Sequence, residues 1–187
     1  FRMNDAPISR RFIAFLLDFF MSGALMSGLL YVLDYYTIFS VVSRFAGGEE
    51  KAYLQVYILF IGIFFIYELL STLLLRATPG KIMANIETEF PGNYFVGRTF
   101  LRSLLKTITV ATAPIGIPLT LLFGFSRNSS GVIHDAICKS SITNESRCPR
   151  LFGILIFALA TACFVVFYFH YQQYFLDLRL IKIPTLY

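Results

Sequence analysis

Charged residues are scarce in this chain, since Asp, Glu, Lys and Arg make up 14% of its 187 residues. A soluble domain carries about a quarter. The sequence has no Trp, but it has 21 Phe, 57% hydrophobic residues and a mean hydropathy of +0.69. This composition excludes an ordinary soluble domain and indicates one membrane domain. The net charge of +5 does not indicate nucleic acid as a partner, because the basic residues flank apolar runs and so favour contact with anionic lipid headgroups.

The sequence also lacks the usual signatures of an enzyme. It contains no P-loop and no GxGxxG motif, and it shows no set of nucleophile, His and acid. One His and two Cys in the same loop do not complete a four-ligand zinc site. We therefore expect no catalytic residue, no metal site and no cofactor, and we predict that the protein is not an enzyme.

Three apolar runs are long enough to cross a bilayer as helices, which takes about 20 residues. They cover residues 12–33, 53–75 and 151–169. A cleavable signal peptide fits the first run less well, because the run is as long as a full span and no small-residue cleavage site precedes Asp34. We expect three transmembrane helices.

A fourth apolar stretch, residues 107–125, contains Pro114, Gly116 and Pro118. These residues disfavour a continuous helix, so the stretch is either one kinked span or a re-entrant pair of short helices. The re-entrant alternative places most Lys and Arg residues on one side of the membrane, as the positive-inside rule prefers. It also brings Asp135 to the side of the first span that carries Arg11.

The loop after this stretch, residues 126–150, gives the opposite indication. It contains two Asn-x-Ser sequons, at 128–130 and 144–146, together with Cys138 and Cys148. Such features are typical of an external, oxidising location. Sequons arise easily in loops rich in Ser and Asn, so we give them less weight. The spacing does not establish whether the two cysteines are bridged.

Two carboxylates lie inside the predicted spans, Asp18 in the first and Glu68 in the second. Arg11 precedes Asp18 by seven residues, so the two share one helix face, with Asp18 about 10 Å deeper. A charge at that depth is costly unless it faces protein or water, and it usually has a function. The two acids are candidates for a proton or cation site. The alternative is that they pair with cations or hydroxyl groups and only fix helix packing.

The segment between the second and the fourth apolar runs is predicted to lie at the membrane surface. Residues 82–90 alternate in polarity, a turn follows at 91–93, and residues 94–96 return, which predicts a small β-hairpin. A helix from Gly97 then places Arg98, Arg102 and Lys106 on one stripe, opposite apolar residues. This pattern is typical of an interfacial helix that contacts lipid headgroups. A second short interfacial helix is predicted within residues 35–45.

His134 and Asp135 stand side by side in the loop that follows the fourth stretch. A histidine beside a carboxylate can exchange protons near neutral pH. More often, such a pair fixes the start of a helix, and we favour that interpretation.

Several motifs occur in a fixed order along the chain. They are Arg11-x6-Asp18, Thr78-Pro79-Gly80-Lys81, a strand–turn–strand, Gly97-Arg98-x3-Arg102 and His134-Asp135. In this order they resemble the RDD family of membrane proteins, which is named for an arginine and two aspartates. The matching residues would be Arg11, Asp18 and Asp135. The resemblance covers residues 10–142, which leaves a short N-terminal tail, 1–9, and an additional transmembrane helix with a C-terminal tail, 143–187.

The resemblance implies a multi-span membrane protein. Sodium/proton antiport has been proposed for some members of the family, and others are accessory or scaffold proteins. With the residues above, it leads us to expect an all-α integral membrane protein with three full transmembrane helices, a broken or re-entrant segment and a small surface β-hairpin. The N-terminus is expected to be cytoplasmic, since Arg10 and Arg11 precede the first span.

Two functions follow from the intramembrane acids. The first is a cation/proton transporter, or a component of one, with Asp18 as the carrier, Glu68 as a second carrier, and Arg11 and Asp135 as groups that tune the pKa of Asp18. The second is a non-catalytic accessory or scaffold subunit of a larger membrane complex, in which these residues form a structural cluster. A chain with so few spans must oligomerise or find partners to enclose a pathway, so we expect a homo-oligomer or a larger membrane complex. We also expect the lipid bilayer itself to be a partner, through its anionic headgroups.

Overall fold

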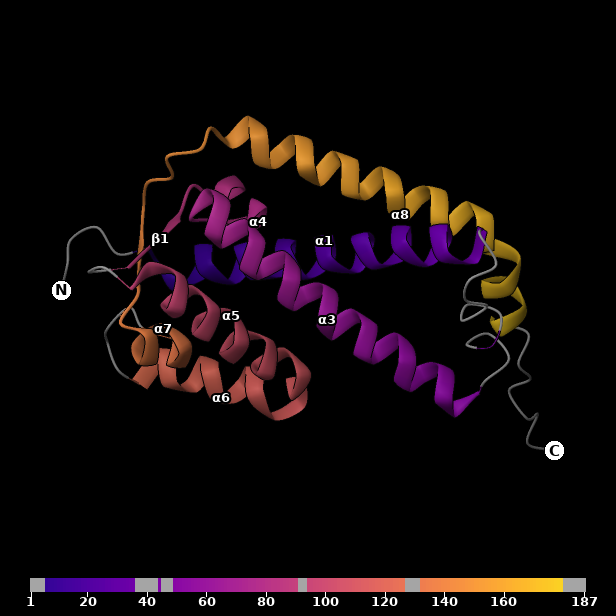
Figure 1. Ribbon diagram of the computed structural model, residues 1–187, viewed down its shortest axis with the longest axis horizontal. Coiled ribbons are helices and arrows are strands. Elements are labelled where there is room, and N and C mark those ends of the chain that lie inside the picture. Colours follow the sequence, from indigo (N-terminus) through magenta and orange to yellow (C-terminus); the bar gives the residue numbers. More distant parts are fainter. Residues whose placement is uncertain (1–5, 36–43, 45–48, 91–93, 127–131, 180–187) are drawn as a thin grey trace.

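The computed structural model describes residues 6–35, 44, 49–90, 94–126 and 132–179. Three long helices dominate it: α1 (Ile8–Tyr35), α3 (Glu50–Leu75) and α8 (Arg150–Arg179) (Figure 1). The segments Ile8–Asp34, Glu50–Leu75 and Arg150–Gln172 are each long and apolar enough to cross a membrane. The three predicted transmembrane helices are therefore confirmed.

The long helices pack through small and aromatic residues. Helix α1 contacts both α8 and α3, and Ala24 of α1 is buried in a cluster with Tyr67 of α3 and Ala160 of α8. One turn further along α1, a Cβ atom added to Gly28 would lie 3.5 Å from Cys163 Cβ of α8. The small side chains of α1 therefore let α8 approach closely, as is usual for helices packed in lipid.

The fourth apolar stretch is a bent helix pair, α5 (Phe95–Ala111) and α6 (Ala113–Ser126). The two arms turn through 120°. The turn is tight, because a Cβ atom on Gly116 would lie 2.5 Å from the carbonyl oxygen of Thr109, and only glycine fits there. The predicted broken segment is confirmed. It is longer than predicted, since the helix expected to begin at Gly97 begins at Phe95 and forms the first arm.

Helix α5 buries its polar face and exposes its apolar face. The buried residues are Thr99, Arg102, Ser103, Lys106, Thr107 and Val110, and the exposed ones include Phe100, Leu101, Leu104 and Ile108. This arrangement is the reverse of that on a soluble protein, and it fits a helix surrounded by lipid. The prediction that Arg102 and Lys106 contact lipid headgroups is wrong, because both side chains point into the protein. Arg98, near the start of the helix, is half-buried.

Four short elements gather at one end of the long helices. They are α4 (Pro79–Met83), β1 (Glu87–Glu89), α7 (Ile133–Cys138) and β2 (Ser141–Thr143). Strand β1 pairs with β2 in antiparallel register, with Thr88 opposite Ile142. This pairing buries Ile142 in a cluster with Ile86, Ala6 and Ala14.

The small antiparallel sheet is thus present, but its predicted second strand is wrong. Residues 95 and 96 belong to the amphipathic helix α5, and Ile82, assigned to the first strand, lies in α4. The distant strand β2 supplies an apolar residue to the core beneath the sheet, which a local hairpin to residues 94–96 would not do. The predicted turn at 91–93, most of the interfacial helix predicted within 35–45 and the sequon at 128–130 lie outside the described residues.

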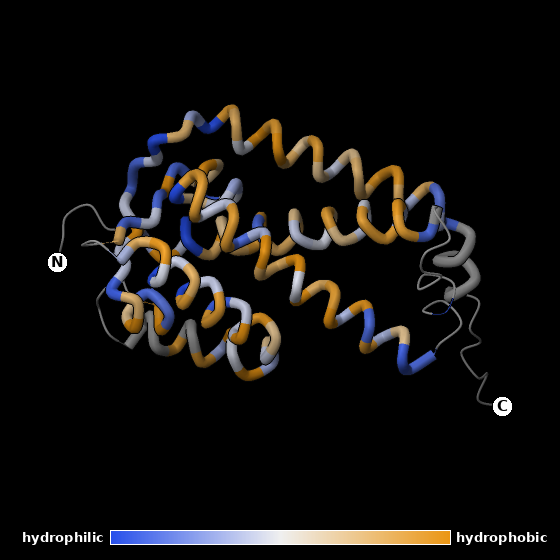
Figure 2. Tube along the Cα trace, in the orientation of Figure 1, coloured by the Kyte–Doolittle hydropathy of each residue, from blue (hydrophilic) through white to orange (hydrophobic). Residues whose placement is uncertain are grey.

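Both flanks of the α5–α6 pair lie at this same end. The backbone N–H of Ala6 donates to the carbonyl oxygen of Ile142 (2.8 Å), which joins the start of α1 to β2. Hydrophilic residues collect at this end, whereas apolar residues run along the long helices (Figure 2). The segment from α7 to β2 therefore lies at the same end of the molecule as the start of α1, which is the arrangement that a re-entrant α5–α6 pair would give.

Thiol labelling tests this topology. Cys138, Cys148 and Cys163 are all free, but Cys138 is buried and burial raises the pKa of its thiol, so Cys148 is the better reporter. In oriented vesicles, proteins carrying one cysteine at a time should react with a membrane-impermeant thiol reagent. We expect Cys148 and Glu89→Cys to react from one side and Lys51→Cys from the other. Reaction of Cys148 from the side of Lys51→Cys would show that α5–α6 crosses fully.

Candidate functional site

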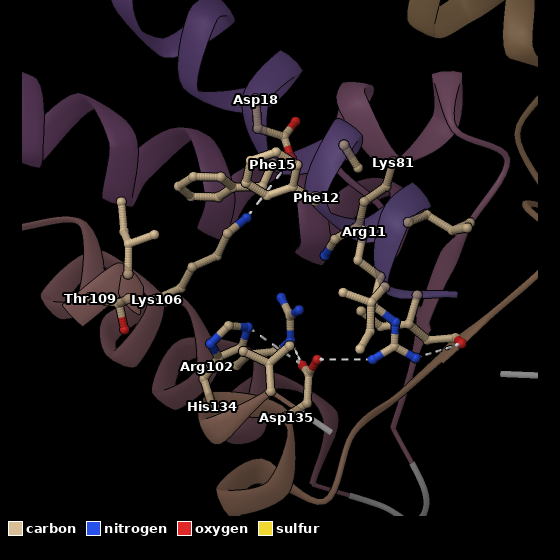
Figure 3. Close-up of a pocket in the computed structure, with 16 residues that line it drawn as sticks. Arg11, Phe12, Phe15, Asp18, Lys81, Arg102, Lys106, Thr109, His134 and Asp135 are labelled. Atoms are coloured by element: carbon tan, nitrogen blue, oxygen red, sulfur yellow. Dashed lines mark hydrogen bonds and ion pairs between the residues drawn. The ribbon is translucent and has the colours of Figure 1, made fainter. Parts of the chain in front are cut away.

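Seven charged side chains are buried together where α1, α3, α4, α5 and α7 meet, and we call them the charged cluster. They are Arg11, Asp18, Glu68, Lys81, Arg102, Lys106 and Asp135. None is more than 8% exposed. Four are cations and three are carboxylates. Figure 3 shows all of them except Glu68 around a shared cavity.

Glu68 is the carboxylate on which the cations converge. Lys106 Nζ lies 2.6 Å from its Oε2, and Arg102 Nη1 lies 3.0 Å from its Oε1. Lys81 Nζ lies 3.6 Å from Oε1. Glu68 carries the one charge of residues 52–75, so it needs these partners to stay charged away from water.

Asp135 ties α7 to the same group of cations. Its Oδ1 accepts hydrogen bonds from Arg102 Nε (2.7 Å) and Ser140 Oγ (2.9 Å), and Arg11 Nη1 lies 3.9 Å from its Oδ2. Burial, the largest single influence, would raise the pKa of Asp135, but the surrounding positive charges, Arg102 first, together with the hydrogen bond from Arg102, hold this pKa below its usual range. Arg102 therefore bridges Glu68 and Asp135, two acids from different helices.

Asp18 fixes the start of α4. Its carboxylate accepts hydrogen bonds from Tyr67 OH (2.8 Å), Thr78 Oγ1 (2.5 Å) and the backbone N–H of Gly80 (2.9 Å). Thr78 is extended before Pro79, which opens α4, so the N–H of Gly80 is one that the short helix cannot satisfy itself. A Cβ atom on Gly80 would lie 2.6 Å from Asp18 Oδ1, so glycine is required for this approach.

Lys106 connects Asp18 to the rest of the cluster, and Arg11 connects the start of α1 to β2. Lys106 Nζ lies 3.8 Å from Asp18 Oδ2 and so links Asp18 to Glu68. Arg11 Nε donates to the carbonyl oxygen of Ala6 (2.9 Å), and Arg11 Nη2 reaches that of Ile142 (3.5 Å). Arg11 therefore holds the start of α1 and the β2 strand beside Asp135.

The ionisation of Lys81 depends strongly on its surroundings. Its Nζ donates to Thr88 Oγ1 (2.9 Å). Burial, and then the charge of Arg102, lower the pKa of Lys81 to about 7, although Glu68 acts in the opposite direction. Counted with all three carboxylates ionised, the cluster has one excess positive charge when Lys81 is protonated and none when Lys81 is neutral.

His134, the second residue of α7, lies beside Asp135. Its Nε2 is 3.8 Å from Asp135 Oδ1. Burial lowers the pKa of His134 to about 3, so the ring is neutral at pH 7 and does not exchange protons near that pH. His134 lies in the first turn of α7, and the interpretation that the pair fixes the start of this helix stays a prediction.

A cavity of about 100 Å³ adjoins the cluster. Charged and apolar side chains share its wall, which is lined by Ile8, Arg11, Phe12, Ala14, Phe15, Asp18, Lys81, Ile86, Arg102, Lys106, Thr109, Ile117, Val132, His134, Asp135 and Ile142. Among the described residues, no group of His, Cys, Asp and Glu is arranged to hold a metal ion.

The structure gathers all five residues named from the sequence as ion, proton or polar-cluster candidates, namely Arg11, Asp18, Glu68, His134 and Asp135. It also shows three members that sequence reasoning did not place in the site: Lys81, Arg102 and Lys106. The i, i+4 spacing of Arg102 and Lys106 on one helix face was visible. The spacing was assigned to the lipid surface, whereas in a membrane protein a polar face turns inward.

A model of the RDD family matches residues 6–178 of the chain. The match covers most of the sequence, and the protein belongs to the RDD family of membrane proteins. The matched segment extends beyond residue 142 and includes the membrane-spanning part of α8. No curated protein and no solved structure matches the chain.

The role of Glu68 gives a stability prediction. Glu68→Gln leaves Lys81, Arg102 and Lys106 without their common counter-charge. Removing one partner of a buried ion pair costs about 3–5 kcal/mol, so Glu68→Gln should lower the free energy of unfolding by about this amount. The exposed Glu145→Gln should change the free energy of unfolding by less than about 0.5 kcal/mol. Thermal unfolding of both purified variants in detergent measures the difference. Equal stability of the two variants would show that the cations do not depend on Glu68.

The lowered pKa of Lys81 gives a pH dependence. In the unfolded chain Lys81 keeps its ordinary pKa of 10.5, so between about pH 7 and 10.5 the unfolded state binds more protons than the folded state. The contribution of Lys81 therefore makes the folded protein more stable as the pH rises through this window. In unfolding experiments from pH 6 to 10, the free energy of unfolding of Lys81→Gln should rise less steeply with pH than that of wild type. The exposed Lys51→Gln should follow wild type. Parallel curves for wild type and Lys81→Gln would contradict the lowered pKa.

Proposed function

We propose that this protein is a non-catalytic accessory or scaffold subunit of a larger membrane assembly, and that the charged cluster is the structural element that holds its helices together. The observation that carries the proposal is the set of hydrogen bonds to Asp18. Three donors, from Tyr67, Thr78 and Gly80, engage its carboxylate. A carboxylate that carries an ion must exchange its partners, and this one is held by donors that belong to the fold.

The other two carboxylates support the same function. Glu68 contacts three cations, and Asp135 contacts Arg102 and Arg11. In the described residues, every carboxylate of the cluster thus has a cation of the protein within 4 Å. A transported cation would have to displace a neighbouring Lys or Arg. The network instead joins α1, α3, α4, α5 and α7, which suits a fixed helix arrangement.

The outer surface suits a subunit that works beside others. Helix α8 exposes Leu151, Leu155 and Leu159, one turn apart, and it packs mainly against α1 and α4. Three spans and one re-entrant pair are too few to surround a pathway. The exposed apolar faces are therefore available to lipid and to neighbouring transmembrane helices.

We also propose that the end of the molecule with α4, α7 and the sheet faces the cytoplasm. Exposed basic residues lie at this end, including Arg10, Lys139, Arg147 and Arg150. This distribution supports the orientation because positive residues favour the cytoplasmic side.

A second candidate function, cation/proton exchange, is favoured by one observation. Lys81 lies on the cavity wall, and its pKa of about 7 allows it to gain and lose a proton at physiological pH. In this function Lys81, and not Asp18, would bind the proton, and the change of its charge would alter the affinity of the cavity for an ion.

Two measurements on one preparation separate the functions. The protein is extracted from its native membrane in lipid nanodiscs for mass determination, and the purified chain is reconstituted for cation-dependent proton flux. The scaffold function predicts a stable assembly much heavier than the 21.3 kDa chain, and no flux. A lone chain whose flux is abolished by Lys81→Gln but kept in Lys51→Gln would overturn the scaffold function and establish exchange.

A further inference from the structure

The break between α5 and α6 leaves backbone carbonyl groups without the donors that a continuous helix would supply. Pro114 has no N–H, so it cannot donate to the carbonyl oxygen of Val110, four residues earlier. The N–H of Ile115, which would donate to Ala111 in an unbroken helix, donates to the carbonyl oxygen of Thr112 instead (2.9 Å). Ala111 is the last residue of α5, and its carbonyl oxygen therefore needs a donor from outside the helix.

Tyr57 of α3 supplies this donor. Its hydroxyl group donates a hydrogen bond to the carbonyl oxygen of Ala111. A backbone carbonyl group without a partner is costly in a lipid environment, because no water is present to bond it. The side chain of Tyr57 is 46% exposed, so tight packing does not hold its ring in place. The hydrogen bond is therefore the main contribution of Tyr57 to this contact.

Polar contacts thus attach α5 to α3 at two separated points. At the first point, Arg102 and Lys106 contact Glu68. Tyr57 precedes Glu68 by 11 residues, so the second point lies about 16 Å away along α3. The ion pairs fix the first arm of the α5–α6 pair, whereas Tyr57 fixes the place where the pair bends.

The position of α6 depends on this bend. Helix α6 lies on the outer side of α5 (Figure 1), and it packs mainly against α5 and α7. Ile117 of α6 lines the cavity together with Phe12 and Phe15 of α1 (Figure 3), and nearly all of the surface of this cavity is apolar. The cavity lies between α6 and α1, so the angle of the bend sets the distance between these two helices.

We propose that the hydrogen bond from Tyr57 to Ala111 is a latch on the α5–α6 pair. While this hydrogen bond is formed, the bend is held against α3 and α6 closes one wall of the cavity. When it breaks, α6 moves away from α1 and the cavity opens to the lipid. The latch is independent of the scaffold function, since it requires neither a partner subunit nor transport.

Distances between two spin labels test the latch in the purified full chain in lipid nanodiscs. The labels are attached at Leu119→Cys of α6 and Leu155→Cys of α8, both exposed, after the native cysteines have been replaced by Ala. We expect one narrow distance distribution with Tyr57 present. Tyr57→Phe removes only the hydroxyl group and should give a broader distribution at longer distances, whereas the exposed Tyr94→Phe should not. An unchanged distribution in Tyr57→Phe would overturn the proposal.

A matched pair of unnatural residues separates the hydrogen bond from the shape of the side chain, and it also serves if Tyr57→Phe does not fold. At position 57, para-aminophenylalanine keeps an N–H donor in place of the O–H. Para-fluorophenylalanine fills nearly the same space without a donor. We expect the amino residue to keep the narrow distribution and the fluoro residue to broaden it. Equal distributions for both would show that the hydrogen bond does not hold the bend, and would overturn the latch.

The opening of the cavity is measured with a thiol on its wall. In Ile117→Cys, reaction with the membrane-permeant reagent N-ethylmaleimide should be about fivefold faster when Tyr57→Phe is added, since loss of a hydrogen bond shifts an equilibrium by about this factor. Ile115→Cys, at a residue that is 75% exposed, should react at the same rate with and without Tyr57→Phe. Equal rates for Ile117→Cys in the two backgrounds would show that the cavity stays closed, and would overturn the role of α6.

Discussion

The ion pairs around Glu68 are the interaction on which the rest of the structure depends. Glu68 lies in an apolar helix that spans the membrane, where an unpaired charge would be costly. It stays charged because Lys81, Arg102 and Lys106 reach it from two other helices. These cations in turn bring Asp18 and Asp135 into the network. The need to neutralise these charges thus positions five helices. The hydrophobic effect cannot hold the helices together, because the surrounding lipid is as apolar as their outer faces.

Helix α5 shows how the membrane reverses the usual logic of an amphipathic helix. Its polar stripe turns inward to carboxylates, and its Phe and Leu residues turn outward. The bend at Thr112 then allows α6 to return beside it, and α7 follows at the level of Arg102. The re-entrant pair is therefore more than a loop within the membrane. It places Lys106 and Arg102 beside the carboxylates of the transmembrane helices, and a cavity lies between this pair and α1.

The sequence allowed much of this architecture to be predicted, because charges and prolines stand out in apolar runs. Asp18 and Glu68 were recognisable as intramembrane acids, and the Pro and Gly residues near position 116 indicated the broken segment. The strand partner of β1 was not predictable, since β2 lies more than fifty residues away and its pairing depends on where α5–α6 returns the chain. Arg102 and Lys106 were visible as a stripe, but a stripe does not say whether it faces headgroups or buried carboxylates. That choice depends on tertiary structure, as does the lowered pKa of Lys81.

The span of the charged cluster along the chain has a consequence for biogenesis. Its members extend from Arg11 to Asp135, and the chain is made from the N-terminus. Asp18 and Glu68 lie in the first two membrane helices and are therefore made before Arg102 and Lys106. These acids gain their cations from α5 only when the α5–α6 pair follows. The final helix arrangement is therefore set late, by the bent α5–α6 pair.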